Sequence, residues 1–152
     1  MAETDTFDVN ARLALIAVDD GDRKGEVSAA LQELGYRVHL AASADDGRDR
    51  LRKTSYDVIV IDQAFQGGTL LDNPLLNLLQ GMPMTSRRYM LVGLLGPEFK
   101  TLDNMTAFSQ SVNVVVNYND VAQIKAVLER AIAENDQFFR VIRTVLQEAG
   151  KR

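Results

Sequence analysis

Cysteine is absent from this chain of 152 residues, which excludes disulfide frameworks, thiol catalysis and metal centres with thiolate ligands. Histidine occurs only at His39, so a metal site built on several histidines is excluded as well. No apolar run approaches the roughly 20 residues of a membrane-spanning helix. The formal net charge of −4 is opposite in sign to that of most nucleic-acid-binding proteins. We therefore expect a soluble, cytoplasmic protein that binds neither nucleic acid nor membranes.

The composition is that of an ordinary globular protein, with 46% hydrophobic and 25% charged residues. The length suits one domain with little left over. Residues 1–10 have no hydrophobic periodicity and contain three acidic residues, which is typical of a flexible tail. We predict a single domain over residues 11–133 and a helical extension over residues 134–152.

Short apolar runs alternate with helical patterns along the chain. The runs cover residues 13–18, 37–41, 57–61, 89–95 and 113–116. All but one are continuously apolar, as expected of parallel strands covered on both faces, whereas 37–41 is more polar and fits an edge strand. Strands that alternate with helices imply right-handed βαβ units. The pattern predicts an α/β fold with a doubly wound, five-stranded parallel sheet in the order 2-1-3-4-5.

Residues that favour helix ends stand at the boundaries of the helical patterns. Gly35 follows apolar residues spaced three and four apart, and it predicts the end of the first helix. Serine, threonine, asparagine and aspartate side chains accept hydrogen bonds from the first N–H groups of a helix, and proline is favoured just after them. The helix starts predicted on this basis are Ser43, Asp72 or Asn73 before Pro74, Thr101 and Asp120.

Aspartates follow two of the predicted strands. Asp19 and Asp20 come directly after the first strand, and Asp62 directly after the third. In a doubly wound sheet, ligands bind beyond the carboxyl ends of the strands, where the strand order reverses between strands one and three. Converging carboxylates repel one another unless a cation lies between them, and hard oxygen ligands suit Mg²⁺. The three aspartates are therefore candidate ligands of a weakly bound Mg²⁺.

Two stretches around these aspartates, ALIAVDDGDRKGEVSAALQELGY (residues 14–36) and SYDVIVID (residues 55–62), match a known pattern. The first resembles the first strand, acidic pair and first helix of response-regulator receiver domains, the CheY-like family of two-component signal transduction. The second is similar to their third strand, and the similarity extends over about residues 12–133. The resemblance implies that Asp62 accepts a phosphoryl group from a histidine kinase. The magnesium ligands that it implies are Asp19, Asp20, Asp62 and the backbone carbonyl of Ala64.

The resemblance fails at the positions that respond to phosphorylation in receivers. Their fourth strand ends in Thr or Ser, where this chain has Gly93 or Leu94, neither of which carries a hydroxyl group. Their fifth strand ends in Lys, where this chain has Asn117, and the aromatic residue of that strand is replaced by Val114. The comparison implies an atypical receiver, in which phosphorylation of Asp62 does not produce the usual conformational response.

An amphipathic pattern continues past the expected end of the domain. Apolar residues recur at spacings of three and four up to residue 149. This pattern fits either one continuous helix or two helices separated by a break at Asn135 and Asp136. A broken helix would fold back on its own domain. A continuous helix would overhang the domain and favour a homodimer or another protein partner, with Asn135 setting the register. The apolar residues that such an interface would use are Phe138, Ile142, Val145 and Leu146.

The favoured function is a receiver-like signalling module without enzymatic activity, which contacts other signalling proteins, a histidine kinase among them. One alternative is a conventional single-domain response regulator phosphorylated on Asp62. Another is a small flavodoxin-like enzyme or nucleotide-binding protein, which the absence of a glycine-rich turn after the first strand disfavours. The basic residues closest in sequence to the acidic pair, Arg23 and Lys24, are expected to be solvated at the start of the first helix.

Overall fold

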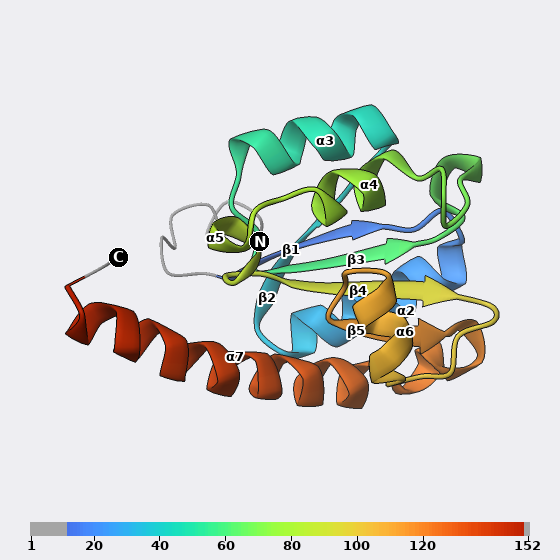
Figure 1. Ribbon diagram of the computed structural model, residues 1–152. Coiled ribbons are helices and arrows are strands. Elements are labelled where there is room, and N and C mark those ends of the chain that lie inside the picture. The colour runs from blue at the N-terminus through green and yellow to red at the C-terminus, as the bar shows by residue number, and fades with distance from the viewer. Residues whose placement is uncertain (1–11, 151–152) are drawn as a thin grey trace.

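Parallel strands form the central sheet in the order β2-β1-β3-β4-β5 (Figure 1). The computed structural model describes residues 12–150, so the predicted tail at residues 1–10 lies outside the described residues. The strands are β1 (Arg12–Ala17), β2 (Tyr36–Leu40), β3 (Val58–Asp62), β4 (Leu91–Gly96) and β5 (Val114–Asn117). The predicted fold class and strand order are confirmed.

The burial of the strands follows their place in the sheet. Every residue of β3 and β4 is buried, and β1 and β5 are buried apart from one end of each strand. On β2, at the edge, only Tyr36 is buried. Interior strands of a parallel sheet pair on both sides and are covered on both faces, which favours a continuously apolar sequence. The prediction of an edge strand from the more polar run is confirmed.

Helices cover both faces of the sheet (Figure 1). On one face, Leu31 and Leu128 belong to a core that lies between the sheet, the first helix and the last helix. On the other face, Leu76 and Ala107 belong to a second core. The helices are α2 (Gly21–Glu33), α3 (Ala44–Lys53), α4 (Pro74–Gln80), α5 (Met84–Arg87), α6 (Asn104–Ser109) and α7 (Ile124–Glu148), with the 3₁₀ segments η1 (Phe65–Gly67) and η2 (Tyr118–Gln123).

Two of the predicted helix starts and one predicted helix end are confirmed. The Ser43 hydroxyl accepts a hydrogen bond from the Asp46 N–H at 3.0 Å at the start of α3. The N-cap of α4 is Asn73, which directly precedes Pro74, and not Asp72. Gly35 follows the end of α2 with a φ of 95°, a left-handed conformation in which glycine has no steric penalty.

The other two predicted starts are wrong because their side chains bind each other. The Thr101 hydroxyl donates a hydrogen bond to the Asp120 carboxylate at 2.5 Å, and this contact joins the loop before α6 to η2. Asp103 takes the capping role at α6, where its side chain accepts from the N–H groups of Met105 and Thr106. Asn117 caps η2, and α7 begins four residues after Asp120.

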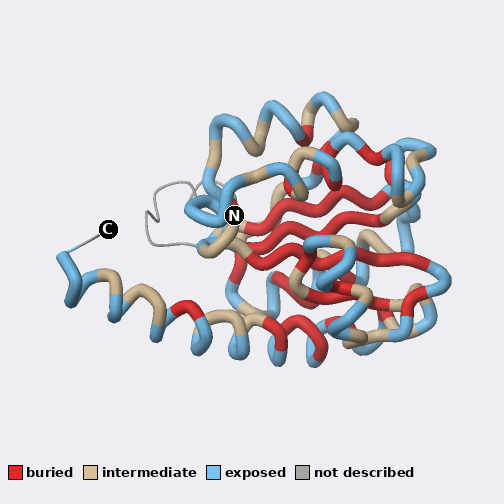
Figure 2. Tube along the Cα trace, viewed as in Figure 1, coloured by how far each residue is buried: buried red, intermediate tan, exposed pale blue. Residues whose placement is uncertain are grey.

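The last helix runs without a break. α7 continues through Asn135 and Asp136 to Glu148, so the alternative of a broken helix that folds back is wrong. Its 25 residues span about 38 Å, and its last turns project beyond the amino ends of the strands (Figures 1 and 2). The Asn135 side chain accepts a hydrogen bond from the Asn113 amide of the same chain at 3.4 Å. None of the described helices is long and apolar enough to span a membrane.

Asn73 provides a test of how the loop after β3 is held. Its side chain is fully buried, caps α4 by accepting from the Leu76 N–H, and donates to the backbone carbonyls of Asp62 and Gln63. Replacing Asn73 with Ala removes these bonds and should lower the free energy of unfolding by about 2–4 kcal/mol, as measured by urea denaturation.

The matched control is Asn77→Ala, because Asn77 lies on the same helix but is exposed. This substitution should be neutral or slightly stabilising, since alanine favours helix. Equal unfolding free energies for the two variants would contradict the role assigned to Asn73.

Candidate functional site

Asp62 is the last residue of β3 and lies opposite Leu95 of β4. It is 2% exposed. One carboxylate oxygen, Oδ1, accepts hydrogen bonds from the Ala64 N–H at 2.9 Å and from the Tyr118 hydroxyl at 2.5 Å. The other, Oδ2, accepts from Nη2 of Arg23 at 3.3 Å. The residue predicted to accept a phosphoryl group is therefore buried, and both of its oxygens are bound by groups of its own chain.

Arg23 lies in the first turn of α2 and points into the acidic site. Its Nη1 is 3.8 Å from Oδ2 of Asp20, and its Nη2 forms the ion pair with Asp62. The guanidinium carbon lies 3.7 Å from the centre of the Tyr118 ring, which is a cation–π contact. The prediction that Arg23 is solvated is wrong, because its side chain is only 27% exposed. A cation of the chain itself thus lies between two of the predicted magnesium ligands.

Asp19 and Asp20 make other contacts at the mouth of the site. The Asp19 carboxylate accepts from the backbone N–H and the side-chain amide of Gln66, at 2.6 Å and 3.3 Å. Gln66 has a φ of 57°, an uncommon left-handed conformation for a residue with a side chain. Asp20 caps α2 by accepting from the Arg23 N–H at 2.9 Å. The Ala64 carbonyl accepts from the Gly67 N–H at 3.0 Å.

These contacts decide how the predicted metal ligands are arranged. Within residues 12–150, no group of three or more Asp, Glu or His side chains is placed so that it could hold a metal ion. As they lie, Asp19, Asp20 and Asp62 do not fit Mg²⁺, because the Arg23 guanidinium already neutralises the buried carboxylate. Magnesium binding by these residues stays a prediction, and it requires that the Arg23 side chain move first.

The end of β4 carries no hydroxyl group. In the register of β3 and β4, Leu95 lies opposite Asp62, one residue beyond the two predicted for that place. Gly93 pairs with Val60, and the Leu94 side chain is fully buried in the core. None of these three residues can donate a side-chain hydrogen bond to a group on Asp62.

At the end of β5, two neighbouring residues have different roles. The Asn117 amide donates to the backbone carbonyls of Pro97 and Phe99 at 3.1 Å and 2.7 Å, so it binds the loop after β4 rather than Asp62. Tyr118, the next residue, reaches Asp62 instead. Val114, at the start of the strand, is buried in the core. Tyr118 and Arg23 are the site residues that the sequence did not indicate.

The contacts in the site shift the acidity of two groups. Burial, and then the hydrogen bond to Asp62, raise the pKa of the Tyr118 hydroxyl far above its ordinary value of 10.0. The hydrogen bond from the Arg23 N–H lowers the pKa of Asp20. Tyr118 therefore remains a hydrogen-bond donor to Asp62 over the whole neutral range of pH.

The predicted interface residues on α7 differ in their exposure. Phe138 and Val145 are 62% and 57% exposed, whereas Ile142 and Leu146 are half-buried. Val141, between them, is also 62% exposed. Phe139, the next residue, is buried, and its ring lies edge-on to that of Phe138 with 4.9 Å between the ring centres. The projecting part of α7 thus has an exposed apolar face.

No family model and no curated protein matches the chain. Several solved structures share its fold at low sequence identity. One is the receiver domain of a sensor histidine kinase from Pseudomonas aeruginosa, and that structure has a magnesium ion coordinated in its active site cleft. It is 19% identical to this chain with a TM-score of 0.61, and the match covers 81% of this chain and 98% of that chain. A CheY-like receiver domain from Methylobacillus flagellatus is 17% identical with a TM-score of 0.58, over 80% and 99%.

An orphan response regulator of H. pylori is 15% identical with a TM-score of 0.57, over 80% of this chain and 96% of that chain. Identities this low establish the fold alone. The chain therefore has the fold of response-regulator receiver domains, as the sequence pattern indicated.

The raised pKa of Tyr118 predicts how stability depends on pH. The unfolded chain releases the Tyr118 proton near pH 10.0, whereas the folded chain retains it to higher pH. The free energy of unfolding should therefore fall as the pH rises above about 10, and it should fall less steeply in Tyr118→Phe. Urea denaturation between pH 8 and pH 11.5 (about the range in which tyrosine ionises) measures both slopes. Parallel curves for the two proteins would contradict the contact between Tyr118 and Asp62.

Proposed function

We propose that the chain is a receiver-like signalling module that acts through protein–protein contacts and whose acidic pocket is closed by its own Arg23 and Tyr118. The receiver fold supports a role in two-component-type signal transduction. The single observation that carries the rest of the proposal is the environment of Asp62, which is 2% exposed and accepts hydrogen bonds from Tyr118, Ala64 and Arg23. An aspartate in this state is poorly placed to react with a phosphodonor.

Phosphoryl transfer to Asp62 would need two things that these contacts oppose. A carboxylate oxygen must be free to attack in line with the leaving group, and a divalent cation must neutralise the transferred oxygens. Oδ1 is bound by Tyr118 and Ala64, and Oδ2 by Arg23. This favours the atypical module over a conventional phosphorylated regulator, in which Asp62 is accessible.

The same geometry sets the conditions for a weak magnesium site. Asp19, Asp20 and Asp62 would serve as ligands only after Arg23 leaves its ion pair with Asp62. A hydrogen bond to a charged group contributes about 1.5–3 kcal/mol, so the competition lowers the affinity for Mg²⁺ about tenfold or more. Arg23 is thus proposed to keep the pocket in a metal-free state.

The test compares the wild type with Arg23→Ala in the presence of Mg²⁺ and beryllofluoride. NMR spectra of the wild type should change little on β4 and β5, because Asn117 and the end of β4 offer no contact to a group on Asp62. Arg23→Ala should bind Mg²⁺ about tenfold more tightly. Lys24→Ala, next to Arg23 on α2, is the matched control and should behave as the wild type.

Two results would overturn this part of the proposal. Large shifts on β4 and β5 of the wild type that disappear in Asp62→Asn would favour a conventional phosphorylated regulator. Unchanged magnesium affinity in Arg23→Ala would show that Arg23 does not close the pocket.

The partner surface that we propose is the projecting part of α7. Phe138, Val141 and Val145 lie three and four residues apart, so they share one exposed face of the helix. Burial of a large apolar side chain is favourable by about 1.5–3 kcal/mol, which this face gains only in contact with another molecule. Met105 and Phe108 on α6 are exposed as well, at 76% and 81%. We propose that a second copy of the chain covers the exposed apolar face of α7 and forms a homodimer.

The dimer is tested with Val141→Asp and Val145→Asp in one chain. Both side chains are exposed, so the substitutions should leave the fold intact while they place charges in the proposed interface. Light scattering at micromolar concentration should give a dimer for the wild type and a monomer for the variant. Thr144→Asp, on an exposed position of the same helix, is the control and should remain dimeric. A monomeric wild type would refute the homodimer.

A further inference from the structure

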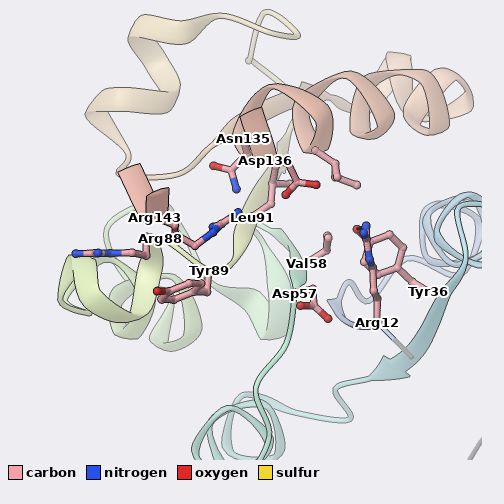
Figure 3. Close-up of a pocket in the computed structure, with 11 residues that line it drawn as sticks. Arg12, Tyr36, Asp57, Val58, Arg88, Tyr89, Leu91, Asn135, Asp136 and Arg143 are labelled. Atoms are coloured by element: carbon pink, nitrogen blue, oxygen red, sulfur yellow. Dashed lines mark hydrogen bonds between the residues drawn. The ribbon is translucent and has the colours of Figure 1, made fainter. Parts of the chain in front are cut away.

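A pocket of 260 Å³ lies at the amino ends of the strands, at the opposite end of the sheet from Asp62 (Figure 3). One wall is formed by the first residues of the strands and the loops before them, which contribute Arg12, Arg88 and Tyr89. The other wall is the part of α7 that passes beyond the sheet, which contributes Asp136 and Arg143. The pocket therefore exists because α7 continues past the strands.

Three arginines line this pocket, and the contacts that each makes within residues 12–150 are to groups other than carboxylates. Arg12 donates to the Tyr36 hydroxyl at 3.4 Å. The guanidinium carbon of Arg143 lies 5.7 Å from the centre of the Tyr89 ring. Within residues 12–150, none of the three arginines takes part in an ion pair.

The third arginine, Arg88, donates through Nε to the Met84 carbonyl at 3.4 Å. A guanidinium carries five N–H donors in a planar fork that matches the oxygens of a phosphate or carboxylate. The contacts of Arg12, Arg88 and Arg143 occupy only part of these donors. As far as the described residues are concerned, the remaining donors are available to an anion in the pocket.

Acceptors lie beside these donors. Asp57 and Asp136 line the pocket together with Asn135. One oxygen of Asp57 accepts the Leu13 N–H at 2.9 Å, and no other group in the described part of the chain binds its second oxygen, which is left for a ligand. Because two carboxylates partly offset three guanidinium groups, a ligand fits best if it is a dianion that also donates hydrogen bonds. A phosphate ester with free hydroxyl groups has both properties.

We propose that this pocket binds a small phosphomonoester that carries hydroxyl groups, with a sugar phosphate as the chemical class. The guanidinium groups of Arg88 and Arg143 bind the phosphate, and carboxylate oxygens of Asp57 and Asp136 accept hydrogen bonds from the hydroxyl groups. The site is separate from the acidic pocket at Asp62, so binding of a ligand here does not depend on the function proposed above.

The experiment is an NMR titration of the full chain with ribose 5-phosphate, in a phosphate-free buffer in which sodium chloride keeps the ionic strength constant. Amide signals of Val58 and Leu91, which line the pocket, should shift in a saturable manner, whereas free ribose should have no effect. Replacing both Arg88 and Arg143 with Gln should weaken the binding at least about tenfold, since each removes a charge-assisted hydrogen bond.

Arg140→Gln is the matched control, because Arg140 lies three residues before Arg143 on α7 but does not line the pocket. It should bind as the wild type does, and equal melting temperatures should show that the variants are folded. The titration is repeated with Glu3, Asp5 and Asp8 changed to their amides, because these carboxylates precede Arg12 and could compete with the ligand.

Saturable shifts that the Arg88 and Arg143 substitutions abolish would support the proposal. It would be overturned if neither the wild type nor the amide variant responds to ribose 5-phosphate. It would also be overturned if the double arginine variant and Arg140→Gln bind equally well, since the arginines of the pocket would then have no part in binding.

Discussion

A carboxylate buried at the end of a central strand must have its charge balanced by its neighbours. Removing an ion from water costs several kcal/mol, so a buried carboxylate is stable only with hydrogen-bond donors or a cation beside it. Asp62 obtains them from Arg23 on α2, Ala64 after β3 and Tyr118 on η2. Its single negative charge therefore holds together three segments that are far apart in the sequence.

The surrounding loops are joined by a second set of polar contacts. Asn73 binds the backbone carbonyls of Asp62 and Gln63, Asn117 binds the loop after β4, and Asp19 binds the backbone at Gln66. Parallel strands end at the same edge of a sheet, so loops that follow different strands come within reach of each other's side chains. Because each of these side chains binds backbone, the rim of the site is shaped by main-chain geometry as much as by charge.

The elements that the sequence predicted well are those determined by local pattern. Continuous apolar runs identified the buried strands, and the pair Asp72 and Asn73 before Pro74 identified the start of α4, where the structure selects Asn73 as the cap. The errors arose where a side chain bound a distant partner. Thr101 is a good cap by type but donates to Asp120 instead. The turn of Arg23 towards Asp62 depends on the placement of α2 relative to β3, which no local pattern specifies.

The continuity of α7 has a mechanical consequence. Its first turns are fixed in the core through Ile124 and Leu128, and Phe139 is the last buried residue within the described part of the chain. Ala149 lies ten residues, about 15 Å, further along the same axis. An unbroken helix is stiff over this length, so it moves as one rigid body whose first turns are fixed in the core against the sheet. A small change in the tilt of its first turns therefore displaces the last turns by a larger distance. A force on the last turns is in the same way transmitted along the helix to the core.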